Sequence, residues 1–341
     1  MGVKLSGLVI RKDIKIEELS NKKLAFDAFN VLYQFLSSIR QRDGSLLMDS
    51  KGNVTSHLMG LWTRFTNLML KDIKIAVVFD GKPPELKFRT TELREEKKKI
   101  AEEKFKEAVE AEDVETAYKY SKQTIRLTKD MIDEAKELLS AMGLPVIQAP
   151  SEAEAQASYM CKKGNVWAVA SNDFDCMLYG APRVILNLTL SSTRRLASGQ
   201  VIEIKPNLID LKENLEHLKL NNEQLVVLAI IVGTDYNPGG VFRVGPKKAY
   251  DLVKKCKDKK DFNKLFEDLK PSFNWLEIYN TFKDMPITKD YKLKWEKPDV
   301  KRIKRILVDK HDFSEERVDS VIEKLEKIKE TKKQSDLNRW F

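Results

Sequence analysis

Short apolar runs alternate along the chain with longer segments of helical periodicity. The runs, rich in Val, Ile, Phe and Ala, cover residues 23–29, 75–79, 145–149, 166–170 and 183–188. Residues 55–70 and 130–142 instead place apolar side chains three and four positions apart, which is typical of amphipathic helices. Strands that alternate with helices predict an α/β fold with a mostly parallel central sheet, covered by helices on both faces.

Residues 86–126 depart from this pattern, because they favour helix but are almost entirely charged. Only a few apolar side chains are scattered among them: Ile100, Phe105, Val109 and Tyr118. Taken alone, this composition predicts an exposed helical hairpin that is stabilised by ion pairs between residues four positions apart, with little hydrophobic packing.

The second half of the chain carries a pair of helices around a glycine-rich stretch, and then a C-terminal amphipathic helix. Residues 223–232 are apolar enough for a buried helix, and a second helix begins at Pro246. Two helices around such a hairpin are typical of modules that bind the DNA backbone. Ser314 is the expected N-cap of the last helix, whose apolar period ends after Lys329.

We therefore divide the chain into three predicted parts. Residues 1–270 form a core that contains the charged segment at about 86–126 and the two-helix module at about 222–256. Residues 271–330 form a helical extension packed on this core, and residues 331–341 form a flexible tail.

Composition narrows the class of partner. The 341 residues include 61 Lys and Arg against 52 Asp and Glu, and the resulting net charge of +9 favours a polyanionic partner. The three cysteines, Cys161, Cys176 and Cys256, are too widely separated for a disulfide framework or a zinc site, which fits a reducing compartment. No apolar run approaches the ~18 residues that cross a bilayer. We expect a soluble, intracellular protein (cytoplasmic or nucleoid-associated, or nuclear in a eukaryote) with no membrane partner.

Acidic residues follow the predicted strands at the point where each strand ends. Asp27 closes the first strand and Asp80 the second, and a further acidic residue lies in the glycine-rich hairpin, at Asp235. The others follow the third and fourth strands: Glu152, Glu154, Asp173 and Asp175. Because the carboxyl ends of parallel strands line one crevice, we expect these side chains to converge.

Converging carboxylates repel one another and stay partly protonated unless cations lie among them. Oxygen ligands without nearby His or Cys favour Mg²⁺ or Mn²⁺ over Zn²⁺. Two such ions about 4 Å apart can activate water and stabilise the leaving oxygen in phosphodiester cleavage. Any one of these acidic residues, such as Asp27 or Glu152, would by itself more often be a helix cap or turn former.

Six ordered motifs carry a resemblance to a known family. They are Phe26-Asp27-Ala28, residues 55–60 (TSHLMG), 78–84 (VFDGKPP), 149–157 (APSEAEAQA), 171–175 (SNDFD) and 233–236 (GTDY). Together they resemble the flap endonuclease family of structure-specific 5′ nucleases, in its archaeal type. The resemblance implies a monomeric 5′-flap endonuclease and 5′–3′ exonuclease that acts on branched DNA during replication (Okazaki fragment maturation) and repair, by two-metal-ion hydrolysis.

The resemblance also implies roles for individual residues. Two Mg²⁺ ions, for which Mn²⁺ can substitute, would be bound directly or through water by Asp80, Glu152, Glu154, Asp173, Asp175 and Asp235. Asp27 would lie close by as a further metal-binding and catalytic residue. Lys87 and Arg94 match the basic catalytic pair that contacts the scissile phosphate.

The DNA contacts carry over in the same way. Tyr33 matches the residue that stacks on the base beside the cut, Arg40 lies at the wedge where the duplex bends, and Thr55 matches a contact to a single unpaired 3′ nucleotide. Residues 86–126 would form the helical arch that a single-stranded 5′ flap threads. The hairpin that begins at Gly233 resembles a helix-hairpin-helix variant. Its amides near Gly245 would bind a phosphate.

Two further features concern this hairpin and the tail. Lys247 and Lys248 would join the phosphate contact, whereas Arg243 stands where the family pattern has glycine, which puts a potassium site there in doubt. The tail resembles a clamp-binding box that would dock on a sliding clamp of the PCNA type, through Gln334, Leu337, Trp340 and Phe341. No long basic extension follows the box, which is typical of archaeal members.

Three other functions are each suggested by part of the sequence. A phosphatase of the haloacid dehalogenase type is suggested by Asp173 and Asp175, but the residues around Asp27 lack its nucleophile pattern. A catalytically inactive module that binds branched DNA would leave the carboxylates with structural roles. A nuclease that incises bubbles in excision repair would need a longer insertion than residues 86–126.

Overall fold

The computed structural model describes residue 5 and residues 7–41, 43–111, 113–189, 193–195 and 200–337. Within these ranges, a seven-stranded sheet has the order β1-β9-β6-β5-β2-β3-β4. Its strands are β1 (Lys12–Asp13), β2 (Lys23–Asp27), β3 (Lys74–Phe79), β4 (Val146–Gln148), β5 (Ala168–Ala170), β6 (Arg183–Leu186) and β9 (Asn207–Asp210). Strands β2 to β6 are parallel, and β1 and β9 add an antiparallel edge. The predicted α/β class with a mostly parallel sheet is confirmed.

Side chains of the central strands alternate between two apolar cores, one on each face of the sheet. In β2, Leu24 and Phe26 belong to one core, whereas Ala25 belongs to the other. β3 shows the same alternation, with Val77 on the first face and Val78 on the second. Because both faces are buried, these strands read as continuous apolar runs in the sequence.

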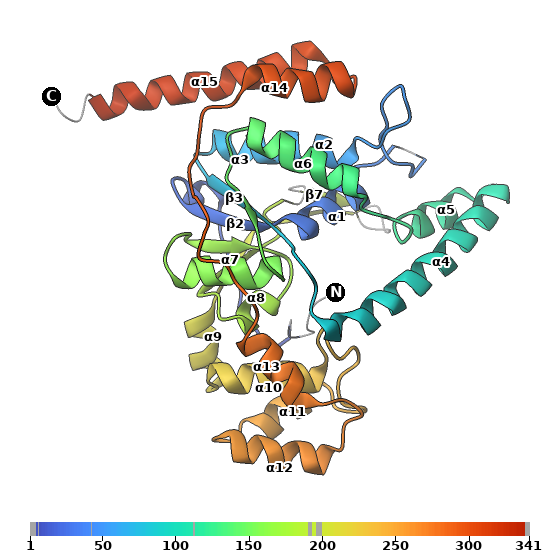
Figure 1. Cartoon of the computed structure of the whole chain (residues 1–341), viewed down its shortest axis with the longest axis vertical. Coiled ribbons are helices and arrows are strands. Elements are labelled where there is room, and N and C mark those ends of the chain that lie inside the picture. Colours follow the sequence, from blue (N-terminus) through green and yellow to red (C-terminus); the bar gives the residue numbers. More distant parts are fainter. Residues whose placement is uncertain are drawn as a thin grey trace.

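Helices cover the two faces in separate layers (Figure 1). The core that contains Phe26 is covered by α1 (Ala28–Ser38), α2 (Ser56–Gly60), the π-helical turn η2 (Leu61–Phe65), α3 (Thr66–Leu70) and α6 (Lys129–Ala141). The last helices join the same core: α14 (Val300–Lys304), η4 (Arg305–Lys310) and α15 (Glu315–Leu337). The other core is covered by α7 (Ala153–Lys162), α8 (Asp175–Leu178), α9 (Leu211–Leu218), α10 (Asn222–Val232), α11 (Pro246–Val253), α12 (Lys259–Leu269) and α13 (Trp275–Lys283).

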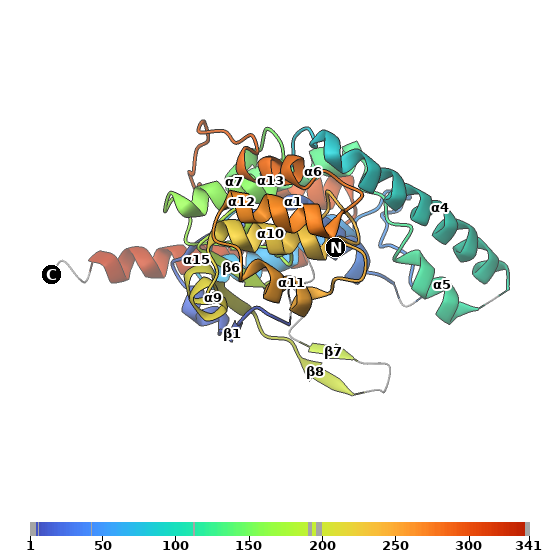
Figure 2. The same ribbon diagram turned by 90° about the horizontal axis from the view of Figure 1, so that it is seen from below.

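The charged segment forms two helices that project from the body of the molecule, α4 (Phe88–Glu110) and α5 (Val114–Ser121) (Figure 2). They pack together through small side chains, since Ala101 and Ala108 are buried while the larger Ile100 and Val109 stay more than half exposed. Ile100 and Val109, two of the scattered apolar residues of this segment, therefore contribute little to the packing. Ion pairs from Arg126 to Glu95 and Glu102 hold the base of this arch.

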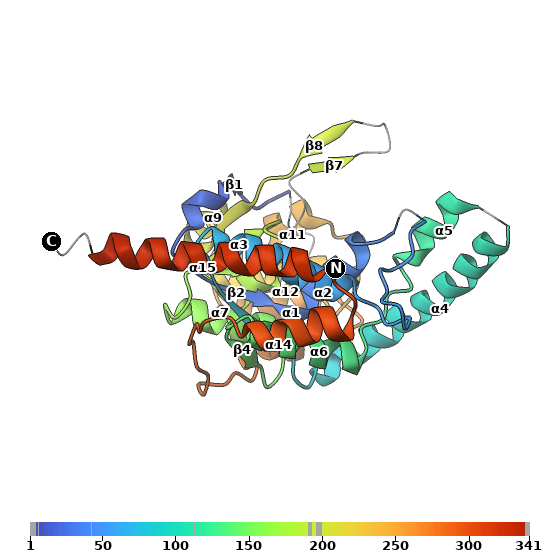
Figure 3. The same cartoon turned by 90° about the horizontal axis from the view of Figure 1, so that it is seen from above.

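Helix α15 extends further than the apolar period predicts, because it continues past Lys329 to Leu337 (Figure 3). The residues after Lys329 are charged but favour helix, and extending an existing helix costs far less than starting one. In the clamp-box segment the structure describes only the helical backbone as far as Leu337, and Trp340 and Phe341 lie outside the described residues. The flexible tail and the domain boundaries stay predictions.

Three features of the fold have no counterpart in the sequence patterns above. The edge strands β1 and β9, and the projecting hairpin of β7 (Thr193–Arg195) and β8 (Val201–Glu203), are too short to show alternation (Figure 2).

None of the helices in the described ranges is both long enough and apolar enough to cross a membrane.

Candidate active site

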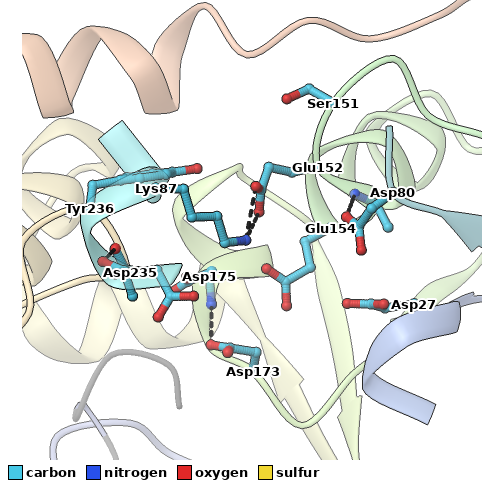
Figure 4. A network of polar contacts seen from close by, with 12 residues as sticks. Asp27, Asp80, Lys87, Ser151, Glu152, Glu154, Asp173, Asp175, Asp235 and Tyr236 are labelled. Carbon is cyan, nitrogen blue, oxygen red and sulfur yellow. Dashed lines mark hydrogen bonds and ion pairs between the residues drawn. The ribbon is translucent and has the colours of Figure 1, made fainter. Parts of the chain in front are cut away.

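The acidic residues from the strand ends meet at one edge of the sheet, around a cleft of about 660 Å³ (Figure 4). The carboxylates that line this cleft are Asp27, Asp80, Glu152, Glu154, Asp173 and Asp235. Asp175 lies beside them at the start of α8. The cleft also contains Lys87 and Arg94 from the base of the arch, together with Tyr33 from α1.

Two of the carboxylates also hold the ends of helices. Asp27 is the N-cap of α1, and its Oδ1 accepts a hydrogen bond of 3.0 Å from the backbone N–H of Asn30. Asp80 Oδ1 accepts a bond of 2.7 Å from the N–H of Ala153 in the first turn of α7. The capping role expected for an isolated acidic residue is therefore present, and it fixes where each carboxylate points.

Asp173, Asp175 and Glu154 are joined by a chain of local hydrogen bonds. The N–H of Asp175 donates to Asp173 Oδ1 at 3.2 Å, and the N–H of Asp173 donates to Ser171 Oγ at 3.1 Å. The hydroxyl of Ser171 in turn donates to Glu154 Oε1 at 3.4 Å. The turn between β5 and α8 thus sets the spacing of these carboxylates.

Burial and repulsion from neighbouring carboxylates raise the pKa values of Asp27, Glu154 and Asp175, which favours their protonated forms. Burial, and then the neighbouring Asp80, raise the pKa of Asp27 to about 8. The pKa values of Glu154 and Asp175 are well above the ordinary range, again through burial first and through Asp173 second. Ionising these carboxylates in the folded protein therefore costs free energy, and a bound cation would reduce that cost.

Two cations of the arch already offset part of this charge. Lys87 Nζ lies 2.6 Å from Glu152 Oε2 and 2.9 Å from Oε1, and Arg94 Nη2 lies 2.6 Å from Asp235 Oδ2. Burial opposes the charged ammonium of Lys87, but the Glu152 carboxylate raises its pKa above the usual value. The hydroxyl of Thr90 in α4 also donates to the carbonyl oxygen of Asp235.

The donor set fits hard divalent ions. It is made of carboxylate oxygens alone, and Asp175 Oδ1 is buried without a hydrogen-bond partner among the described residues. Within those residues, no three His, Cys, Asp or Glu side chains are yet grouped closely around one point. Two of the carboxylates instead have cations of the protein as partners, since Glu152 pairs with Lys87 and Asp235 with Arg94.

Besides Lys87 and Arg94, which are predicted to contact the scissile phosphate, Tyr33 lines this cleft, where the residue is 38% exposed and Lys98 Nζ lies 5.8 Å from the ring centre. Arg40 instead ties its guanidinium to the end of α5, with Nη2 donating to the carbonyl of Ser121 at 3.0 Å. Thr55 is buried at the start of α2. The contacts of Arg40 and Thr55 in the protein alone are thus structural.

The hairpin between α10 and α11 depends on unusual backbone conformations. Gly233 has φ 112°, and a Cβ there would approach the Gly240 nitrogen to 2.8 Å. Arg243, at φ 60°, occupies the left-handed region that favours glycine. Gly245 begins α11 with nothing within 4 Å of a Cβ position, which leaves room for a phosphate beside its amide. Lys247 and Lys248 are exposed in the first turn of that helix.

Sequence reasoning missed several side chains that support the site. The hydroxyl oxygens of Tyr179, which directly follows α8, and Tyr236 lie 2.7 Å apart, and their hydrogen bond links the segments that carry Asp175 and Asp235. Asn237 is buried, and its Oδ1 accepts from the hydroxyl of Thr234 at 2.7 Å. Tyr236 follows Asp235 directly in a recognised motif and could have been considered, whereas nothing in the sequence singles out Tyr179.

An oxygen-only donor cluster that faces basic arch residues is suited to phosphodiester hydrolysis, and it defines the class of protein as a nuclease. Comparison with known proteins agrees with this class. Residues 1–101 match the XPG N-terminal domain, and residues 143–235 match the XPG I-region.

Flap endonuclease 1 of Thermococcus onnurineus is 50% identical to this chain, over 100% of the chain and 99% of the relative. The Pyrococcus furiosus flap endonuclease 1 is 49% identical with the same coverage. The solved structure of flap endonuclease-1 from Methanococcus jannaschii superposes with a TM-score of 0.76 at 44% identity, covering 95% of this chain and 98% of that one. The chain therefore belongs to the flap endonuclease family, whose members are phosphodiester hydrolases. The predicted family and enzyme class are confirmed.

Proposed function

We propose that the chain cuts branched DNA at the base of a 5′ flap in a Mg²⁺-dependent reaction at the cleft described above. The observation that carries this proposal is the convergence of the strand-end carboxylates with Lys87 and Arg94 at the foot of the arch. A cluster of like charge beside one cation from α4 and one from the turn before it is suited to binding metal and phosphate together.

Two Mg²⁺ ions would be held by Asp80, Glu152, Glu154, Asp173, Asp175 and Asp235, with Asp27 adjoining. When bound, such ions supply an activated water and stabilise the leaving oxygen. The residues fit because their donors are all oxygen and because Asp175 Oδ1 has no partner among the described residues.

Lys87 and Arg94 would exchange their carboxylate partners for the scissile phosphate. Both side chains reach into the cleft from α4 and the turn before it, so a phosphate that enters there meets the same ammonium and guanidinium groups. In the transition state they would stabilise the charge that builds up on the phosphate oxygens. Tyr33, at the edge of the cleft, offers an exposed ring face for stacking on the neighbouring base.

The remaining surfaces would hold the rest of the branched substrate. The arch of α4 and α5 supplies Lys97 and Lys98 to the cleft, and a single-stranded flap threaded there would meet these cations. The N-terminus of α11, with Lys247 and Lys248, would bind a duplex phosphate. Arg40 at the wedge would bind the duplex where it bends, and Thr55 would contact the unpaired 3′ nucleotide.

The tail would dock the enzyme on a sliding clamp of the PCNA type. Gln334, Leu337, Trp340 and Phe341 have the order of polar, aliphatic and aromatic groups that such a pocket takes, and an exposed Trp-Phe pair would otherwise be a liability. This role is separate from the cleavage chemistry.

Cleavage of four labelled substrates tests the proposal: 5′-flap, bubble, 3′-flap and plain duplex DNA, each with and without Mg²⁺. We expect rapid, Mg²⁺-dependent cutting of the 5′ flap and much slower cutting of the others. Binding without cutting would instead support the inactive DNA-binding module, and a preference for bubbles would support the excision-repair nuclease.

A further inference from the structure

A buried cluster outside the active-site cleft joins the C-terminal extension to the loop that precedes α2. His311 follows η4 and is 3% exposed. Its Nδ1 lies 3.0 Å from Oδ2 of Asp49 in the loop, and its Nε2 lies 3.2 Å from Oε1 of Glu134 in α6. One imidazole ring thus connects three segments that are distant in the sequence.

Asp49 in turn determines the shape of its loop. Its Oδ1 accepts hydrogen bonds from the backbone N–H groups of Lys51, at 3.0 Å, and Asn53, at 2.8 Å. Its Oδ2, which faces His311, also accepts from the side-chain amide of Asn53 at 2.9 Å. Asp312, the neighbour of His311, accepts from the N–H of Ser50 at 2.8 Å. The loop therefore closes around one carboxylate, and the C-terminal extension holds that carboxylate.

The same three segments enclose a pocket of about 460 Å³. Asn53 and Val54 line it from the loop and Lys310 from η4, with Lys310 Nζ 2.6 Å from Glu134 Oε1. The acidic residues of α6 that line it are Asp130, Asp133, Glu134 and Glu137. Residues 50–53 are exposed, so apolar packing contributes little to holding this side of the pocket. The contacts of His311 and Asp312 are what fix the loop to the body of the protein.

We propose that His311 is a positioning residue for substrate selection: it holds the Asp49 loop in the shape that receives an unpaired 3′ nucleotide of branched DNA in this pocket. The inference rests on the proposed function, because it takes Thr55, which directly follows Asn53 and Val54, as a contact of that nucleotide. His311 touches neither the nucleotide nor the cleaved bond. It acts through Asp49, whose turn places Asn53 and Val54 at the pocket.

The test compares two substrates that share one 5′ flap and differ only in the presence of a one-nucleotide 3′ flap. The ratio of their kcat/KM values measures how strongly the enzyme uses the 3′ nucleotide. In His311→Ala this ratio should fall by about tenfold, as expected for loss of one buried hydrogen bond to a charged group. The decrease in kcat/KM should affect the substrate with the 3′ nucleotide, and it should arise mainly from a higher KM.

Conservative variants separate the two contacts of the ring. His311→Asn keeps an amide near the position of Nδ1, facing Asp49, and should restore most of the ratio. His311→Gln keeps one near Nε2, facing Glu134, and should not. Lys304→Ala is the matched control, because Lys304 of α14 also carries ion pairs within the C-terminal extension, to Glu315 at 2.9 Å and Asp319 at 2.8 Å, and these residues do not line the pocket.

Equal losses on both substrates, or an unchanged ratio in His311→Ala, would overturn the proposal. A wild-type enzyme that cuts the 5′ flap but gains nothing from the 3′ nucleotide would also overturn it, while leaving flap cleavage intact. Failure of the wild type to cut either substrate would instead count against the proposed function itself.

Discussion

Lys87 Nζ lies 2.6 Å from Glu152 Oε2, so the protein alone neutralises one of its predicted metal ligands with the cation predicted to bind its substrate. Arg94 and Asp235 form a second pair of the same kind, with Arg94 Nη2 2.6 Å from Asp235 Oδ2. Each pair joins the arch to the carboxylate cluster. Entry of metal and phosphate should therefore redistribute these partners together, which makes the base of the arch the link between substrate and metal binding.

Replacing Lys87 tests its proposed role as a phosphate contact in the transition state. Lys87→Ala should slow single-turnover cleavage by about a hundredfold to a thousandfold, because a preorganised cation is lost at the reacting phosphate. Rapid quench with saturating enzyme gives this rate. Lys82→Ala, an exposed lysine outside the cleft, is the control. A change in affinity alone would make Lys87 an ordinary backbone contact.

The raised carboxylate pKa values predict how stability depends on pH in the absence of metal. Burial raises the pKa of Asp27 from its ordinary value near 4 to about 8, so folding favours the protonated form. Stability from this group is fully present below pH 4 and is lost as pH rises toward 8. In EDTA, the melting temperature should therefore fall between pH 6 and pH 8 by more in the wild type than in Asp27→Asn.

Added Mg²⁺ should reverse that loss, because the ions bind the ionised cluster of the folded state and not the unfolded chain. The same melting experiment with Mg²⁺ should show a larger gain at pH 8 than at pH 6. A gain that is equal at both pH values would mean that the carboxylates are not the binding groups.

The strand-end carboxylates could be predicted from the sequence, because parallel strands bring their carboxyl ends to one edge whatever the details of packing. The ion pairs could not. Lys87 and Glu152 are separated by 65 residues and Arg94 and Asp235 by 141, and their pairing depends on where α4 leaves the sheet. Local sequence patterns carry no information about the position and direction in which α4 leaves the sheet.

The same limit applies to the arch and to His311. The sequence pattern of the arch does not indicate which side chains its two helices bury, and close approach of the helices selects small ones, so Ala101 and Ala108 are buried while Ile100 and Val109 stay exposed. A single histidine among polar residues gives no signal of burial. Only the return of the C-terminal extension to the Asp49 loop gives His311 its partners.

DNA affinity should fall steeply with salt, since several phosphates must be neutralised by the arch and by the α11 terminus. We expect a loss of about three decades between roughly 50 and 200 mM salt. The double variant Lys247→Ala/Lys248→Ala should reduce the slope of log affinity against log salt by about two. Titration of a labelled flap at several salt concentrations measures both, and an affinity that is flat over this range would argue against the DNA contacts.

Deleting residues 334–341 should leave cleavage of free oligonucleotides unchanged and remove stimulation by a sliding clamp. The reason is that a clamp raises the local concentration of enzyme at the junction without altering the chemical step. The increase in cleavage rate given by the clamp should appear when enzyme is limiting and vanish when enzyme saturates the substrate. The double variant Trp340→Ala/Phe341→Ala should reproduce most of the loss. Unchanged clamp affinity after deletion would refute the clamp-box interpretation.

The central claim is that the carboxylate cluster performs the cleavage chemistry, and Asp80→Ala and Asp173→Ala test it most directly. Flap binding and single-turnover cleavage are measured side by side in Mg²⁺, with Asp284→Ala, outside the cleft, as control. Both variants should lose cleavage by at least about a thousandfold and keep their flap affinity, because metal ligands act on the transition state more than on the bound backbone. Near-wild-type cleavage by both variants would contradict the account.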